Sequence, residues 1–184
     1  MSVLPLGIYG QSGQVVTLSA ASFAAAGPAA PAPGAWGTRA PLLEANSEMA
    51  VAELHGKIYV IGGYPSSRIS VRTVQVYDPV ENSWKPTTPL PVALNHTMAV
   101  AVSGRLYVIG GQTSASGDGP FVDTTYEYDP AGATWTPRAP MPTQRSGGAA
   151  AVVDGKIYVA GGRPPHWHDF AVYDPRASTW RRLP

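Results

Sequence analysis

The amino-acid sequence predicts an all-β fold of the propeller type, made of repeated units of four antiparallel strands. A hexapeptide that ends in a double glycine occurs three times, at residues 58–63, 106–111 and 157–162. Each copy is followed by Tyr-Asp-Pro and then by a tryptophan, at Trp84, Trp135 and Trp180. The copies lie about fifty residues apart, and a period of that length with several strand-like runs inside it is typical of propeller blades.

The first two strands of each unit are predicted from residue size and turn chemistry. Residues 49–54, 97–102 and 149–153 are rich in alanine, as suits an innermost strand where blades converge and space is short. A turn with glycine follows, which is typical of a tight hairpin. The hexapeptide itself is apolar on both faces, so it reads as a strand between neighbouring sheets. Its double glycine allows close approach of backbones.

The last two strands are predicted from alternation and from proline. The third strand alternates in side-chain character and ends at Asp-Pro, because proline cannot donate a ladder hydrogen bond. The fourth strand begins with the tryptophan and ends in proline-rich sequence, which suits an outer edge strand. We predict that the recurring tyrosine and tryptophan fill the space between adjacent blades.

Composition excludes several classes of function. The chain of 184 residues has a net charge of +1, with no basic run that would indicate nucleic-acid binding. It contains no cysteine, which excludes disulfides, cysteine nucleophiles and thiolate metal sites. No apolar run approaches the length of a membrane span. No phosphate-binding loop, nucleophile elbow or zincin motif is present, and we expect no cofactor.

The combination of double glycine, Tyr-Asp-Pro and a tryptophan about six residues later is similar to the kelch repeat. The resemblance covers residues 36–184 and implies a β-propeller, usually of six or seven blades. It is the triplet that is specific, since a double glycine alone carries no weight. We expect a bacterial kelch-repeat protein with blades at about residues 42–91, 92–142 and 143–184.

The sequence around Trp36 matches the start of a fourth strand, so we predict one extra N-terminal outer strand that belongs to a closing blade. Kelch-like rings often close in this way. Here the third blade has its own outer strand from Trp180, which leaves no vacancy within the chain. Two explanations follow: the chain is the N-terminal half of a longer parent, or two copies associate to complete a ring. Three blades alone would expose apolar faces that ought to be buried.

Residues 1–35 differ from the rest and are predicted to be a leader rich in alanine and proline. Ala24-Ala25-Ala26 before a flexible spacer looks like a signal-peptidase site, although no lysine or arginine precedes Arg39. A disordered leader and an export signal both fit. We expect a periplasmic or secreted protein, with a cytoplasmic location as the alternative.

Recognition is predicted at the loops after each double glycine and at the starts of the first strands, because these parts vary on a fixed scaffold. The resemblance to kelch domains implies that Asn95, Arg145 and Ser146 contact a protein, peptide or glycan. The full set of predicted ligand-binding residues is Asn46, Ser47, Tyr64, Arg68, Asn95, Gln112, Arg145, Ser146 and Arg163.

A carbohydrate-active enzyme is the alternative to a binding module. The resemblance extends to kelch proteins that are sialic-acid mutarotases or epimerases, and Glu48, His96 and Arg145 are then the candidate acid, base and anion clamp. A copper radical oxidase is excluded for this chain, because that chemistry requires a cysteine cross-link. His166 and His168 have the spacing of metal ligands, but two histidines alone make a weak site.

Overall fold

The computed structural model describes residues 34–115 and 119–184. Residues 39–184 form one compact unit, and residues 34–38 belong to a separate one. The predicted leader, residues 1–35, lies outside the described residues except for its last two positions. No helix among the described residues has the length and apolar character needed to cross a membrane.

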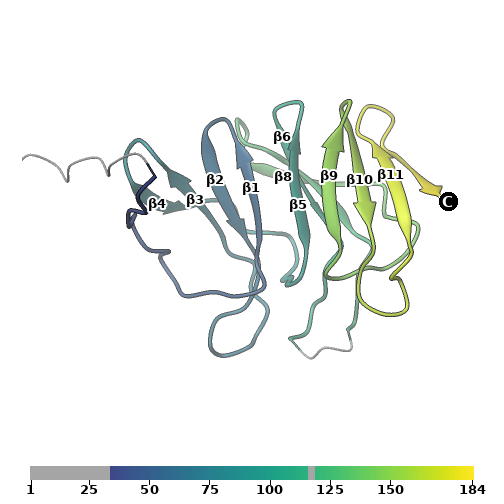
Figure 1. Cartoon of the computed structure of the whole chain (residues 1–184), viewed down its shortest axis with the longest axis horizontal. Coiled ribbons are helices and arrows are strands. Elements are labelled where there is room, and N and C mark those ends of the chain that lie inside the picture. The colour runs from purple at the N-terminus through teal and green to yellow at the C-terminus, as the bar shows by residue number, and fades with distance from the viewer. Residues whose placement is uncertain (1–33, 116–118) are drawn as a thin grey trace, which may run out of the picture. The chain divides into compact units, whose positions relative to one another are not determined.

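The unit at 39–184 contains three four-stranded antiparallel sheets, called blades 1 to 3 (Figure 1). Blade 1 contains β1 (Ala50–Leu54), β2 (Lys57–Ile61), β3 (Val74–Asp78) and β4 (Ser83–Pro86). Blade 2 contains β5 (Met98–Val102), β6 (Arg105–Ile109), β7 (Thr125–Asp129) and β8 (Thr134–Arg138). Blade 3 contains β9 (Ala149–Val153), β10 (Lys156–Ala160), β11 (Phe170–Asp174) and β12 (Thr179–Leu183). In each blade the strands pair in chain order, which confirms the predicted fold class.

Trp36 and its neighbours form no strand among the described residues, and the assignment of this segment to a closing blade stays a prediction. Residues 35–46 have no strand pairing in the described part of the chain. A fourth strand needs a third strand with a free edge, and β3, β7 and β11 are each already paired with a fourth strand of their own. The segment around Trp36 resembles the fourth strands in sequence, but among the described residues it has no third strand with a free edge to pair with.

The hairpins between first and second strands are built from two residues with positive φ. His55 and Gly56 have φ values of 53° and 74°, and the equivalent residues of the other blades have nearly the same values. Two consecutive left-handed residues are the requirement of the type I′ turn, whose twist matches that of the flanking strands. The first two strands of each blade therefore meet in one fixed register.

Tyrosine and tryptophan form the same stacked pair in every blade. The ring centroids of Tyr77–Trp84, Tyr128–Trp135 and Tyr173–Trp180 are 4.9, 4.8 and 5.0 Å apart. Each indole N–H donates to the carbonyl that precedes the proline of the preceding connecting segment, at Ala40, Thr88 and Ala139. Each tryptophan thus satisfies its polar group while its ring packs, which a half-buried indole requires.

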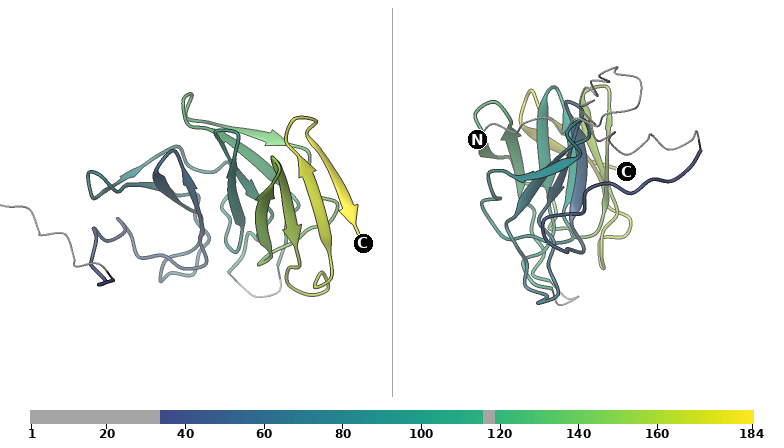
Figure 2. Two further views of the ribbon diagram at one scale, coloured as in Figure 1. Left: turned by 45° about the horizontal axis from the view of Figure 1, so that its top comes forward. Right: turned by 90° about the vertical axis from the view of Figure 1, so that its left-hand side faces the viewer.

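Two apolar cores lie between the blades, which follow one another in chain order (Figure 2). The core between blades 1 and 2 includes Leu54, Ile61, Leu106 and Val108, with Trp135 packed against it. The core between blades 2 and 3 includes Val102, Ile109, Ile157 and Val159, with Trp180 packed against it. Burial of one such aliphatic side chain stabilises the fold by about 1.5–3 kcal/mol. These contacts confirm the inter-blade role predicted for the tryptophans of blades 2 and 3.

Blade 3 presents one face with no sheet against it among the described residues. Val153 occupies the repeat position of Leu54 and Val102, which are 4% and 7% exposed, yet Val153 is 52% exposed. Val51 of blade 1, on the face away from blade 2, is also exposed. The repeat therefore carries apolar residues at positions that only a neighbouring blade covers.

Leu106 lies between blades 1 and 2 and is fully buried. Leu106→Ala should lower the free energy of unfolding by about 2–5 kcal/mol, because the cavity cannot collapse between two sheets. Val80→Ala, at an exposed turn position, should change it by less than about 0.5 kcal/mol. Urea denaturation followed by tryptophan fluorescence measures both, and equal effects would contradict the packing described here.

Gly110 is a close-approach position, whereas Gly155 is only a turn position. A Cβ at Gly110 would lie 2.5 Å from the carbonyl oxygen of Arg145, whereas a Cβ at Gly155 would meet nothing within 4 Å. Both residues have positive φ, 59° and 72°. Gly155→Ala should cost about 1–2 kcal/mol of backbone strain, and Gly110→Ala should cost clearly more. The melting temperatures of the two variants measure this difference, because Gly155→Ala introduces backbone strain alone and Gly110→Ala introduces backbone strain together with a steric clash.

Candidate functional site

The loops that follow β2, β6 and β10, and the segments that precede β1, β5 and β9, lie at one end of the blades, the lower end in Figure 1. We call this end the loop face. The two-residue hairpins between first and second strands lie at the opposite end. The described part of the middle loop stops at residue 115 and resumes at 119.

The backbone of the loop face is held by equivalent contacts, reciprocal in blades 1 and 2 and a single hydrogen bond in blade 3. Ser47 and Tyr64 exchange backbone hydrogen bonds of 3.0 and 2.9 Å, and Asn95 and Gln112 exchange two of 2.9 Å. In blade 3 the N–H of Arg163 donates to the carbonyl of Ser146 at 2.8 Å. The residue directly after each double glycine is thus fixed beside the start of the first strand.

A second set of hydrogen bonds joins one blade to the next. The N–H of His96 donates to the carbonyl of Glu48, and the N–H of Gly147 donates to the carbonyl of His96, both at 2.9 Å. These three residues occupy the same repeat position and share left-handed backbone, with φ of 54°, 48° and 68°. Equivalent positions of the three blades therefore lie next to one another at the loop face.

Glu48, His96 and Arg163 form a charged cluster along this line. Nε2 of His96 lies 3.0 Å from Oε2 of Glu48 and 2.6 Å from Nη2 of Arg163. Burial lowers the pKa of His96; the Glu48 carboxylate opposes this, and the Arg163 guanidinium adds to the lowering. The sequence names all three as site residues but pairs Glu48 and His96 with Arg145, whereas the structure brings Arg163 to them.

The guanidinium of Arg145 is buried in blade 3, where it binds backbone carbonyls of the same blade. It is 1% exposed, and its Nη1 donates to the backbone carbonyls of Val159, Gly161 and Asp169 at 3.1–3.4 Å. Its Nε donates to the hydroxyl of Thr143 at 3.0 Å. The predicted contact of this guanidinium with a ligand, and its predicted role as an anion clamp, stay predictions that its burial and internal hydrogen bonds do not favour.

Three further predicted ligand contacts are also internal. Asn95, Gln112 and Ser146 are fully buried, and the hydroxyl of Ser146 donates to Oε1 of Gln112 at 2.8 Å. Buried polar groups are costly unless hydrogen-bonded, so these residues brace the loops from within. The predicted residues that reach solvent are, fully or in part, Asn46, Ser47, Tyr64, Arg68 and Arg163.

The loops also expose two large apolar side chains that the sequence prediction does not include among the ligand-binding residues. Ile69, in the loop after β2, is 70% exposed, and Trp167, in the loop after β10, is 65% exposed. In the loop after β2, Arg68 lies over the ring of Tyr64, with 5.5 Å between the guanidinium carbon and the ring centroid. In the sequence each is a single apolar residue in a polar loop, which is common at protein surfaces, so no sequence signal marks either position.

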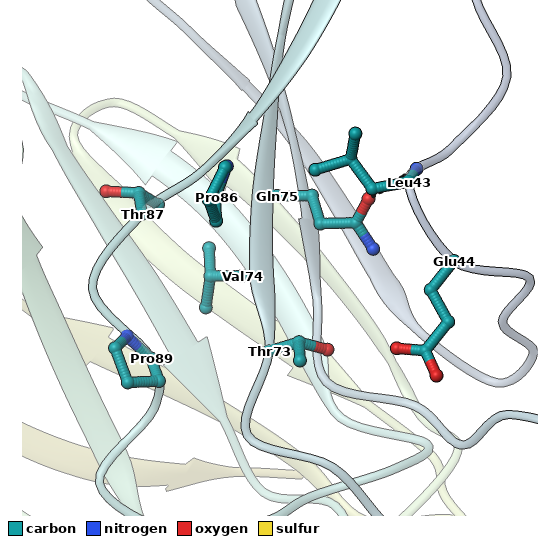
Figure 3. Close-up of a pocket in the computed structure, with 8 residues that line it drawn as sticks. All are labelled: Leu43, Glu44, Thr73, Val74, Gln75, Pro86, Thr87 and Pro89. Carbon is teal, nitrogen blue, oxygen red and sulfur yellow. Dashed lines mark hydrogen bonds between the residues drawn. The ribbon is translucent and has the colours of Figure 1, made fainter.

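A cavity of about 300 Å³ lies at the outer rim of blade 1 (Figure 3). Leu43 and Glu44 line one side, Pro86 and Pro89 line the other, and Val74 lies between them. None of the predicted site residues lines this cavity. Its shape depends on the path of the segment before β1, which the repeat pattern does not specify.

The same repeat position of blade 3 forms a smaller and more polar cavity of about 160 Å³, lined in part by Arg145, His168, Asp169 and Arg182. The hydroxyl of Thr143, followed by the imidazole of His166, holds the pKa of the Asp169 carboxyl below its ordinary value against the opposing effect of burial. Nδ1 of His166 lies 2.9 Å from Oδ2 of Asp169. Within the described residues, no group of three or more histidine, aspartate or glutamate side chains could hold a metal ion.

The structure supplies two of the three groups on which the carbohydrate-enzyme hypothesis depends. Glu48 and His96 are within hydrogen-bonding distance, while Arg145 is committed to backbone carbonyls. An acid–base pair without its anion clamp remains a prediction that an anomer-exchange assay by NMR can test.

Three consecutive blades with stacked Tyr–Trp pairs, left-handed junctions and variable loops at one end define a repeat-built propeller domain. The chain belongs to the kelch-repeat family: residues 35–184 match the family described as the KLHDC2/KLHL20/DRC7 Kelch-repeats domain. This membership supports a protein-interaction propeller module.

The chain is similar to several curated proteins. It is 34% identical to mouse Kelch-like protein 35 over 71% of this chain. It is 52% identical to mouse Kelch-like protein 36 over 26% of this chain, and 45% identical to Kelch-like protein terF of Aspergillus terreus over 28%. The matched segments account for only 21%, 8% and 13% of those proteins. These relatives come from mouse and a fungus, so they do not support the expected bacterial source.

Arg145→Lys should destabilise the fold by at least about 2 kcal/mol, because lysine keeps the charge but cannot reach the carbonyls that the guanidinium satisfies. The matched control is Arg176→Lys at an exposed turn, which should change the free energy of unfolding by less than about 0.5 kcal/mol. Chemical denaturation measures both. An Arg145→Lys protein as stable as the control would show that this guanidinium is not a structural clamp.

Proposed function

We propose that the domain binds a protein or peptide partner at the loop face. The observation that carries this proposal is the exposure of Ile69 and Trp167 on two different loops of that face. Removal of a large apolar side chain from water by a bound partner lowers the free energy of the complex. Tryptophan is also enriched among the residues that dominate binding energy at protein interfaces.

The surroundings of these two residues favour a protein partner over a glycan. Arg68 and Tyr64 offer a stacked cation and aromatic ring next to Ile69 in the chain, and Glu48 and Arg163 add one charge of each sign. Such a mixture of apolar anchors and a charged rim is typical of protein interfaces. An exposed isoleucine contributes little to the binding of a sugar, because sugars are bound mainly by aromatic stacking and polar contacts.

The frame beneath these side chains supports their role in recognition. Buried Asn95, Gln112 and Ser146 hold the loop backbones, and the backbone bonds from Glu48 to Gly147 join the blades. A rigid frame lowers the entropy lost on binding.

The double variant Ile69→Ser, Trp167→Ala should weaken binding tenfold or more, since each residue is expected to act as an interface anchor. The controls are Val80→Ser, an exposed valine at the opposite end, and His55→Ala in an opposite-end hairpin; both should leave binding unchanged. Partners retained by the wild-type chain are first identified by affinity capture, and their dissociation constants are then measured with purified components by calorimetry. Equal affinity for the double variant, or retention of glycans with no protein, would contradict the proposal.

A further inference from the structure

The cavity at the outer rim of blade 1 contains a nearly buried polar group with an unused hydrogen-bonding end. Gln75 is 4% exposed, and its Oε1 accepts a hydrogen bond from the backbone N–H of Leu43 at 3.0 Å. The amide nitrogen of Gln75 points away from Leu43 (Figure 3), and no described residue accepts a hydrogen bond from it. A donor at such a position has lost most of its access to water, so an acceptor inside the cavity would stabilise it.

The second polar group of the cavity is the carboxylate of Glu44. This residue is exposed, and it forms no ion pair with any other described residue. Figure 3 shows the carboxylate on the side of the cavity toward which the amide nitrogen of Gln75 points. One unused donor and one unpaired negative charge together favour a ligand that carries a carbonyl and a cation.

The walls of the cavity are apolar. They are formed by the side chains of Leu43, Val74, Pro86 and Pro89, and Leu43 is 58% exposed. A volume of about 300 Å³ is at the lower end of the range for ligand pockets, which suits one aliphatic side chain better than a large ligand. Such a side chain would remove apolar surface of these walls from water.

The blade itself does not require this pair of polar groups. Gln75 pairs with a valine of β2, so its equivalents are the residues that pair with the corresponding valines of β6 and β10. The equivalents of Glu44 are counted from the carbonyl that accepts each indole N–H. They are Tyr126 and Ala171 for the first position, and Val92 and Thr143 for the second. Blades 2 and 3 therefore fold without a carboxamide and a carboxylate at these positions.

We propose that this rim cavity binds a peptide segment in which a small aliphatic residue is followed by lysine or arginine. The aliphatic side chain contacts the apolar walls, its backbone carbonyl accepts a hydrogen bond from Gln75, and the cation pairs with Glu44. A peptide places a carbonyl directly beside an apolar side chain, which is the combination that the cavity offers. Neither Ile69 nor Trp167 lines this cavity, so the proposal does not rest on binding at the loop face.

The proposal is tested by titration of the full chain with the blocked peptide acetyl-Ala-Val-Lys-amide, followed by ¹H–¹⁵N NMR of the side-chain amide of Gln75. We expect a saturable shift of this signal. Two matched peptides separate the contributions. Acetyl-Ala-Gly-Lys-amide, which lacks the aliphatic side chain, should bind about tenfold more weakly, and acetyl-Ala-Val-Glu-amide, which reverses the charge, should bind at least about threefold more weakly.

Two variants test the polar groups. Glu44→Gln should remove the preference for the lysine peptide over the glutamate peptide. Gln75→Glu retains an acceptor for the N–H of Leu43 but has no donor, so it should lower the affinity for all three peptides. The matched control is Asp154→Asn, which removes an exposed carboxylate in a hairpin at the opposite end and should bind as the wild type does. If Gln75→Glu does not fold, the wild-type titration and Glu44→Gln decide.

The absence of a shift at Gln75, equal affinity for the three peptides, or an unchanged lysine preference in Glu44→Gln would overturn the proposal. The double variant Ile69→Ser, Trp167→Ala should bind the lysine peptide as the wild type does. Failure of the peptide titration therefore leaves the function proposed for the loop face intact, and failure to find a loop-face partner leaves the rim cavity intact.

Discussion

The fold depends on the need of every blade to cover both faces of a four-stranded sheet. The second strands are apolar on both sides, so Ile61 and Ile109 face the following blade while Leu106 and Ile157 face the preceding one. An isolated sheet of this kind would leave both apolar faces in water, at a cost of about 25 cal/mol for each Å². Stability is therefore a property of neighbouring pairs of blades, as in other repeat proteins.

The same requirement explains why the loop face has a fixed backbone and variable side chains. Close packing of sheets brings the carbonyls of Leu94 and Arg145 against the double glycine of the preceding blade, where Gly63 and Gly111 donate to them at 2.8 and 2.7 Å. Side chains at the glycine positions would prevent this approach. Side chains at the residue after the glycines meet no such limit, so tyrosine, glutamine and arginine all occur there.

Most of the fold could be predicted from the sequence because the repeated positions report packing. Tyrosine and tryptophan form the same stacked pair, and glycine the same turn, in all three blades, while the double glycines allow close approach in the two blades that another blade follows. The loop chemistry was predicted less well, because its residues differ between copies and a single chain gives each only once. Arg145 shows the limit: its charge suggested a ligand contact, while its repeat equivalent Leu94 indicated burial, and both are 1% exposed. At this position, comparison with the equivalent residue of another repeat predicts burial better than the residue type does.

The surface of this repeated scaffold is asymmetric because equivalent positions of the three blades carry different side chains. Glu48, His96 and Gly147 have the same left-handed backbone and are joined by the same hydrogen bonds, yet they place an acid, a base and no side chain side by side. The missing side chain of blade 3 leaves room beside His96, and the side chain of Arg163 lies next to Gly147. An added Cβ at Gly147 would lie 3.5 Å from Cγ of Arg163 and 3.9 Å from Cδ2 of His96, so a side chain at this position would lie against both members of the cluster. Repeats that keep the backbone constant can in this way change a site one blade at a time.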